Sequence, residues 1–145
     1  MNLKITNKPL AGYSSWYNRY QDISENTILE DLHGCERILK KGDLFQIDDG
    51  WEMFVGDWIQ DKAKFHCDMK DMVDEIHNRG FLAGLWLAPF VAEEKSELFK
   101  CHKDWLLEIK GERYKCGCNW SGFWALDIDN KEFQEYLKKV FDTVY

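Results

Sequence analysis

The fold is decided by the stretch Leu44-Phe45-Gln46-Ile47-Asp48-Asp49-Gly50-Trp51, in which a short apolar run ends in two acids and a glycine. In a strand, alternate side chains point to opposite faces, so Phe45 and Ile47 share the apolar face and Gln46 and Asp48 share the other. In parallel α/β folds the ligand lies beyond the carboxyl ends of the strands. We therefore expect a strand that ends at Asp48 and carries part of a binding site there.

A strand followed by a helix is expected on each side of this stretch. The preceding strand is Gly12-Tyr13-Ser14-Ser15-Trp16, and the helix after it has Ser24 as its N-cap and ends before Gly42. Its apolar positions recur at helical spacing: Ile28, Leu29, Leu32, Cys35, Ile38 and Leu39. The helix after the central strand begins near Asp68 and stops at Gly80, with Met69, Met72, Val73 and Ile76 on one face.

The third expected strand is Phe81-Leu82-Ala83-Gly84-Leu85-Trp86-Leu87-Ala88. It has no charge on either face, which is typical of a parallel strand buried on both sides. Alternating strands and helices predict an α/β fold with a parallel sheet. Period-two alternation places Trp16, Asp48 and Trp86 on the same side of that sheet, at the ends of its strands.

The remainder of the chain is less regular. We expect a short helix near residues 93 to 102 and a last helix from Asp129 or Asn130, where Asp129 and Glu132 have capping-box spacing. Its apolar residues are Phe133, Tyr136, Leu137, Val140 and Phe141. Since no Pro/Gly-rich linker divides the sequence, residues 1–145 are expected to form a single domain.

Composition excludes several classes of protein. The net charge of −7 comes from interleaved acids and bases with no basic stripe, which argues against nucleic acid and anionic membranes as partners. Five Cys fit no secreted disulfide framework, and Met1-Asn2-Leu3-Lys4 opens no apolar signal segment. We expect a reduced, cytoplasmic protein without a membrane span. An aromatic content of 15%, with seven Trp, suits a protein that stacks sugar rings or other flat ligands.

Two interpretations of the strand ends stay open on the residues alone. Adjacent carboxylates at Asp48 and Asp49 repel and need a compensating partner, which a polyhydroxylated ligand would supply. The alternative is an Asp-Gly turn with a capping or ion-paired acid. Trp16 and Trp86 are equally compatible with sugar contact and with a place in the core.

A metal site is the other alternative, because Cys101, His102, Cys116 and Cys118 supply four possible ligands for zinc. Their spacing does not match the standard pairs of cysteines two residues apart, and free thiols explain them as well. We expect no metal.

Taken together, the motifs of this chain resemble those of glycoside hydrolase family 36, the melibiase-type α-galactosidases. The resemblance covers residues 11 to 145 and follows the family's order and spacing. The matching motifs are Gly12-Tyr13-Ser14-Ser15-Trp16, Phe45-Gln46-Ile47-Asp48-Asp49-Gly50-Trp51, Gly56-Asp57-Trp58, Gly84-Leu85-Trp86-Leu87-Ala88-Pro89-Phe90, His102-Lys103-Asp104-Trp105 and Ala125-Leu126-Asp127-Ile128.

The resemblance implies a fold, a substrate and a set of contacts. The fold would be the first three βα units of a (β/α)₈ barrel, since a whole barrel needs about 250 residues. The substrates would be α-galactosides of the melibiose and raffinose type, cleaved without a cofactor. Asp48 and Asp49 would hydrogen-bond the galactose O4 and O6, and Trp16 and Trp86 would wall the sugar subsite. Loop residues that could line the rim are Trp51, Asp57, Trp58 and Trp120.

The catalytic carboxylates are expected outside this chain. Retaining members use two carboxylates about 5 Å apart. The nucleophile follows strand four, two residues after a lysine, and the acid/base follows strand six. Neither motif is present, and Asp127 lacks the lysine. The resemblance therefore implies no catalytic residue before Tyr145 and no activity for this piece alone.

Two other functions remain as alternatives. The chain could belong to a non-catalytic carbohydrate-binding or structural protein, or form a complete small α/β domain of three or four parallel strands. The oligomeric state is open, with a homo-oligomer among the alternatives.

Overall fold

The computed structural model describes residues 9–144, and the chain divides into two compact units. Unit one contains the residues up to Trp51 together with Lys62–Trp86, and unit two contains Glu52–Asp61 and the residues from Leu87 on. The segment Met1-Asn2-Leu3-Lys4 and Tyr145 lie outside the described residues. Within residues 9–144, every helix falls short of the length and apolarity that a membrane span requires. The expectation of a single domain over 1–145 stays a prediction.

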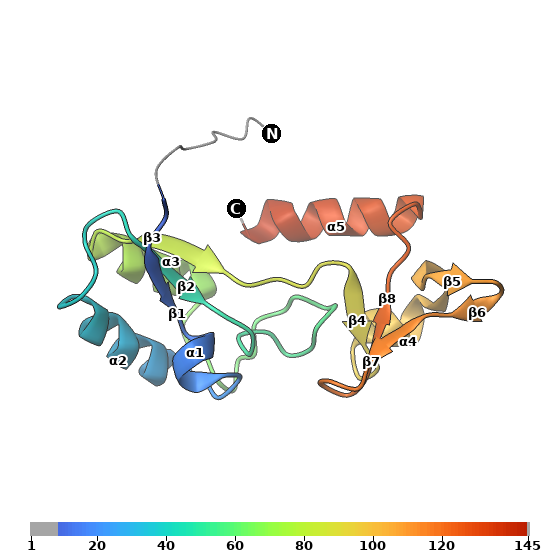
Figure 1. The fold of residues 1–145 in the computed structure, drawn as a ribbon, viewed down its shortest axis with the longest axis horizontal. Coiled ribbons are helices and arrows are strands. Elements are labelled where there is room, and N and C mark those ends of the chain that lie inside the picture. The colour runs from blue at the N-terminus through green and yellow to red at the C-terminus, as the bar shows by residue number, and fades with distance from the viewer. Residues whose placement is uncertain (1–8, 145) are drawn as a thin grey trace. The chain divides into compact units, whose positions relative to one another are not determined.

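Unit one is built on a parallel sheet with the order β1 (Gly12–Ser14), β2 (Leu44–Ile47) and β3 (Leu82–Leu85) (Figure 1). Ser14 pairs with Gln46, which pairs with Gly84, so these positions share one face. Phe45 and Ile47 are buried on the other face. The predicted α/β fold with parallel strands is confirmed, and so is the predicted sorting of Ser14, Gln46 and Gly84 to one face and of Phe45 and Ile47 to the other.

The helices of unit one begin where their caps predict. The helix α2 (Glu25–Cys35) starts after Ser24, whose side chain and backbone exchange hydrogen bonds with Thr27. The helix α3 (Met69–Asn78) starts after Asp68. The predicted extension of α2 to Ile38 and Leu39 is wrong. The backbone N–H groups of Ile38 and Leu39 both donate to the Cys35 carbonyl. Because Ile38 is 80% exposed, a further helical turn would not be stabilised by its burial.

Two expectations about the strands also need correction. Trp16 is not part of the first strand, because it begins the short helix α1 (Trp16–Arg19), whose first carbonyl acceptor is Ser15. The third strand is not buried on both sides, because β3 lies at the edge of the sheet and leaves Leu82 48% exposed. Trp86 follows β3 and continues its pairing through a hydrogen bond from its N–H to the Ile47 carbonyl.

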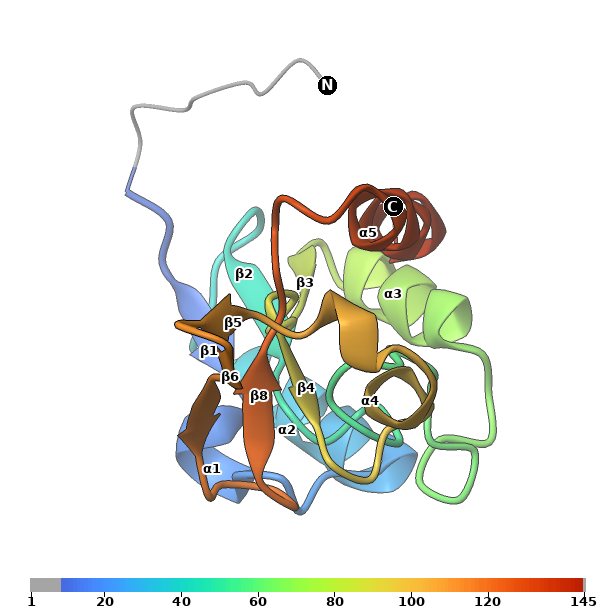
Figure 2. The same ribbon diagram turned by 90° about the vertical axis from the view of Figure 1, so that its right-hand side faces the viewer.

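Unit two contains an antiparallel sheet that the sequence did not reveal. Its order is β4 (Val91–Glu93), β8 (Phe123–Ala125) and β7 (Lys115–Gly117), and a hairpin joins β5 (Glu108–Ile109) to β6 (Glu112–Arg113) (Figure 2). The expected short helix is present as α4 (Glu97–Cys101), followed by a 3₁₀ turn, Lys103–Trp105. Because β8 is antiparallel, the segment around Asp127 is not a fourth parallel strand.

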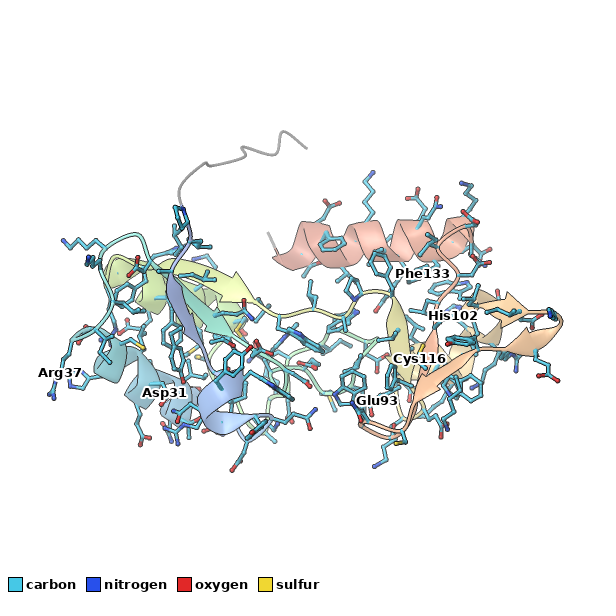
Figure 3. The ribbon with its side chains drawn as sticks, in the orientation of Figure 1. Asp31, Arg37, Glu93, His102, Cys116 and Phe133 are labelled. Carbon is cyan, nitrogen blue, oxygen red and sulfur yellow. The ribbon has the colours of Figure 1, made fainter. Side chains whose placement is uncertain are left out.

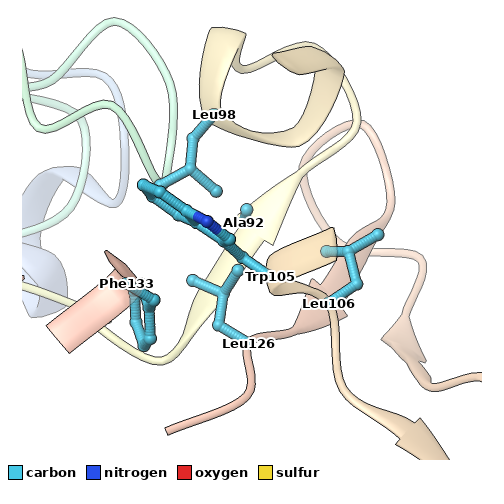
Figure 4. Close-up of a cluster of buried hydrophobic side chains, with 6 residues drawn as sticks. All are labelled: Ala92, Leu98, Trp105, Leu106, Leu126 and Phe133. Atoms are coloured by element: carbon cyan, nitrogen blue, oxygen red, sulfur yellow. The ribbon is translucent and has the colours of Figure 1, made fainter. Parts of the chain in front are cut away.

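The core of unit two packs the last helix, α5 (Lys131–Val144), against this sheet. The buried side chains are Ala92, Leu98, Trp105, Leu106, Leu126 and Phe133 (Figure 4). The helix starts after Asn130, whose side-chain oxygen accepts the Phe133 N–H at 3.1 Å. The predicted capping box is wrong, because Glu132 instead accepts the indole N–H of Trp105.

Candidate active site

Asp48 lies directly after β2 and is only 7% exposed. Its Oδ2 accepts hydrogen bonds from Ser14 Oγ at 2.8 Å and Gln46 Nε2 at 2.5 Å. Both donors share its face of the sheet because Ser14 and Gln46 are in register and Gln46 precedes Asp48 by two residues. The backbone N–H of Asp48 donates to Ser15 Oγ at 2.9 Å. The carboxylate is therefore fixed by two neighbouring strands.

Asp49 is 3% exposed and is held beside Asp48. Its N–H donates to Asp48 Oδ1 at 2.9 Å, and its Oδ2 accepts from Gln21 Nε2 at 2.7 Å. The chain turns immediately afterwards at Gly50, as expected, with a φ of 110°. A Cβ at that position would lie 2.7 Å from the Gln21 carbonyl oxygen, so the turn requires glycine.

Neutral groups compensate the buried charge on Asp48. The ion pairs found among residues 9–144 do not include this carboxylate, and its side-chain donors are a hydroxyl, an amide and a backbone N–H. A carboxylate has about four lone-pair positions, so these three hydrogen bonds leave capacity for one more donor. An incoming hydroxyl group is a suitable donor for this place.

The two tryptophans of the predicted subsite follow β1 and β3. Since all three strands run parallel, Trp16, Asp48 and Trp86 lie at the same, carboxyl-end edge of the sheet. Trp16 is half-buried and contacts Tyr20 edge to face, with ring centroids 5.3 Å apart. Trp86 is also half-buried. The structure brings these residues to one end of unit one, and their contacts with a sugar stay predictions.

Two of the predicted rim residues, Trp51 and Trp58, are more deeply buried than their loop positions suggested. Trp51 is 3% exposed, and its indole N–H donates to the Trp86 carbonyl at 2.9 Å. Asp57 belongs to unit two, where its carboxylate accepts the backbone N–H groups of the first two residues of α4. Trp58 is 8% exposed, and Trp120 contacts Phe123 edge to face. Their roles at a rim likewise stay predictions.

Sequence reasoning missed the carboxylate of Asp31 on α2, whose side chain is 7% exposed (Figure 3). It accepts hydrogen bonds from Tyr13 Oη at 2.6 Å, Asn18 Nδ2 at 3.0 Å, and Arg19 Nε and Nη2 at 3.2 and 2.8 Å. Burial alone would raise the pKa of Asp31, but these donors outweigh burial and lower it. Burial and the neighbouring Asp31 together raise the pKa of Tyr13. Asp31 thereby ties α1 and β1 to α2.

Some of the groups that donate hydrogen bonds to Asp48 and Asp49 can be predicted from the sequence, and others cannot. Ser14 and Gln46 are polar residues on the face that carries Asp48, so alternation identifies them. Gln21 reaches Asp49 across 28 positions of the chain, and no local pattern reports such a contact.

The cysteines and His102 are not gathered into a metal site. Cys101, Cys116 and Cys118 are free and exposed, and His102 stacks on Trp105 with ring centroids 3.8 Å apart (Figure 3). In the part of the chain that the structure describes, no three His, Cys, Asp or Glu side chains are placed to hold an ion.

Comparison with known proteins gives a consistent result over nearly the whole chain. Residues 2–145 match the family model described as Melibiase. The α-galactosidase TtGalA from Thermus thermophilus, solved in complex with stachyose, is similar with a TM-score of 0.87 and 33% identity over 97% of this chain and 31% of that chain.

The matches to two curated relatives cover a smaller share of those proteins. The bifunctional α-galactosidase/sucrose kinase AgaSK of Mediterraneibacter gnavus is 29% identical over 139 residues, which is 90% of this chain and 14% of that protein. The α-xylosidase XylQ of Lactiplantibacillus pentosus is 31% identical over 132 residues, 83% of this chain and 17% of that protein. This chain therefore spans less than a fifth of the length of these two relatives.

Proposed function

This chain belongs to the melibiase family, and on that premise we propose that it forms the galactose-binding part of a retaining α-galactosidase. The observation that carries the proposal is the buried pair Asp48 and Asp49 at the carboxyl end of a parallel sheet, where neutral donors hold the carboxylate of Asp48. Two fixed carboxylates suit the recognition of neighbouring sugar hydroxyls. We assign O4 and O6 of a terminal galactose to them, with Trp16 and Trp86 as the walls.

The strand order supports a barrel as the parent fold. The three parallel strands follow one another in the sheet in chain order, β1-β2-β3, with α1 and α2 between the first two and α3 between the last two. A (β/α)₈ barrel adds its strands in this way, whereas a doubly wound sheet reverses direction at a switch point. We infer that these strands are the first three of such a barrel.

The chain would contribute binding groups and not the attacking carboxylate. Retaining hydrolysis needs a nucleophile and an acid/base. We assign both to strands four and six of the parent barrel. Substrates are proposed to be α-galactosyl oligosaccharides of the melibiose and raffinose type, and TtGalA in complex with stachyose supports this class. No organic cofactor is needed for this chemistry, and we place the enzyme in the cytoplasm.

The test is Asp48→Asn in the complete enzyme that carries this chain, with melibiose as substrate. The amide keeps the shape of the side chain but turns one acceptor into a donor. We expect kcat/KM to fall about 100-fold or more, since a site built to hydrogen-bond a hydroxyl discriminates strongly.

Asp43→Asn is the matched control, because Asp43 lies just before the same strand at its amino end and caps the Lys40 N–H. It should leave the kinetics unchanged. Wild-type kinetics in Asp48→Asn with an unchanged melting temperature would remove Asp48 from the site.

The likeness to XylQ favours a second substrate, an α-xyloside. Xylose lacks the hydroxymethyl group that carries O6 in galactose, so a site with an acid devoted to O6 should prefer galactose. Parallel assays with p-nitrophenyl α-galactoside and p-nitrophenyl α-xyloside separate the two activities. Galactose binding without turnover of either substrate would instead support the non-catalytic alternative.

A further inference from the structure

The short helix α1 and the residue that caps its end carry exposed aromatic side chains beside the proposed galactose site. Tyr17 is 89% exposed and Tyr20 is 65% exposed. Trp16 and Tyr20 are four positions apart and therefore share one face of the turn, which their edge-to-face contact confirms. Tyr17 points about 100° away from that face. Tyr20 thus extends the surface that begins with Trp16.

Tyr20 has a backbone conformation that does not favour a tyrosine. It ends α1 with φ 53° and ψ −133°, a region that side chains with a Cβ rarely adopt and that glycine reaches without strain. Its N–H still donates to the Trp16 carbonyl, so the turn is formed. The backbone gives no reason for a tyrosine at this position, and the Tyr20 ring is largely free of contacts within the described chain. The Tyr20 ring is therefore open to a ligand.

The segment that holds Tyr20 is fastened to the acid pair at both ends. Before α1, Ser15 Oγ accepts the Asp48 N–H at 2.9 Å. After α1, Gln21 Nε2 donates to Asp49 Oδ2 at 2.7 Å. Lys64 Nζ then bridges the Gln21 and Gly50 carbonyls at 3.1 and 2.9 Å. Tyr20 is thereby set at a fixed place relative to Asp48 and Asp49.

A third anchor holds the opposite side of α1. Asn18 and Arg19 both donate to Asp31 on α2, as described above. The helix is therefore immobilised by α2 and by the acid pair, while Tyr20 remains exposed. An aromatic ring that is rigidly held and open to solvent is suited to stacking.

We propose that Tyr20 forms an aglycone site, in which its ring stacks on the sugar that is linked to the bound galactosyl unit. This inference rests on the proposed function. The edge-to-face contact with Trp16 covers at most one face of the Tyr20 ring, and a pyranose presents a C–H face of matching size. Tyr20 then sets the preference for oligosaccharides over α-galactosides with a small aglycone.

The experiment compares raffinose with methyl α-galactoside in the complete enzyme that carries this chain. For Tyr20→Gly we expect the ratio of kcat/KM for raffinose to that for methyl α-galactoside to fall about tenfold, the scale of an aromatic stacking contact. The melting temperature should stay the same or rise, since glycine relieves the strained backbone. Tyr20→Phe keeps the ring and should keep the ratio.

Tyr17→Ala is the matched control, because it removes a more exposed tyrosine from the other face of the same helix. It should leave the ratio unchanged. An unchanged ratio in Tyr20→Gly, or equal losses on both substrates, would overturn the aglycone site while leaving the α-galactosidase assignment intact. A wild-type enzyme that cleaves neither substrate would overturn the proposed function and the aglycone site with it.

Discussion

At the scale of single residues, Asp31 holds α1 against α2. Its carboxylate accepts hydrogen bonds from a phenol, an amide and a guanidinium, two of them on α1. Its side chain is 7% exposed, whereas that of Arg19 is 30% exposed. The carboxylate of this ion pair is therefore shielded from solvent, and its charge-assisted hydrogen bonds are strong.

Asp31→Asn should destabilise the protein by about 2 kcal/mol at pH 7, because the amide group brings a donor against the donors already there. The pKa of Asp31 is lowered in the folded state. A carboxyl of this kind stabilises the fold above its ordinary pKa of about 3.9, and that stabilisation is lost as the pH falls through the lowered value. Urea unfolding should show a difference in the free energy of unfolding between wild type and variant at pH 7, and this difference should be smaller at pH 3.

Glu30→Gln is the control for this measurement. Glu30 also pairs with Arg19 but its side chain is 69% exposed, so its removal should change stability by less than about 1 kcal/mol. If the difference in the free energy of unfolding between Asp31→Asn and wild type stays constant from pH 7 to pH 3, Asp31 acts through packing and not through its charge.

At the scale of elements, α2 depends on its first turn. Ser24 N–H donates to Thr27 Oγ1 at 2.8 Å, and Thr27 N–H donates to Ser24 Oγ at 3.4 Å. Ser24→Ala should lower the free energy of unfolding by about 1 kcal/mol, the usual effect of losing an N-cap. Thermal melts of Ser24→Ala, Thr27→Ala and the double variant would test this.

The two single effects should not add in the double variant, since each change breaks the same reciprocal pair. Ser24→Asp supplies another capping side chain and should restore most of the stability. Additive losses, or a loss in Ser24→Asp equal to that in Ser24→Ala, would contradict a capping role for Ser24.

The elements also show how far the sequence could predict the fold. The starts of α2 and α3 depend on caps and apolar spacing within one segment, and they were predicted correctly. The sequence predicts the end of a strand where α1 begins, because four helical residues leave no period to detect. The strands of unit two pair residues as distant as Val91 and Ala125, and three-residue strands carry no clear alternation. Such pairings are determined by packing at long range.

The candidate site follows the same division. Asp48 and Asp49 were found because they end an apolar strand, and Ser14 and Gln46 share the face of Asp48. The contacts of Gln21 and Asp31 depend on how α1 folds back, which no single segment determines.

At the scale of the molecule, the sheet of unit one has an exposed edge. In the part of the chain that is described, β3 pairs with β2 alone, and Leu82 on this edge strand is 48% exposed. A strand with apolar side chains and an unpaired outer edge pairs readily with another chain. We expect the 145-residue chain by itself to associate as its concentration rises, because the barrel we propose would cover this edge with a fourth strand.

Leu82→Lys should shift sedimentation velocity profiles of the isolated chain towards the monomer, since an edge lysine opposes strand pairing. Ile38→Lys is the matched control, because Ile38 is more exposed, at 80%, but lies in a turn after α2 and not on a sheet edge. It should leave association unchanged. A wild-type chain that stays monomeric and melts in one cooperative step would instead favour a complete small α/β domain, because its edge strands would then be stable in water without the rest of a barrel.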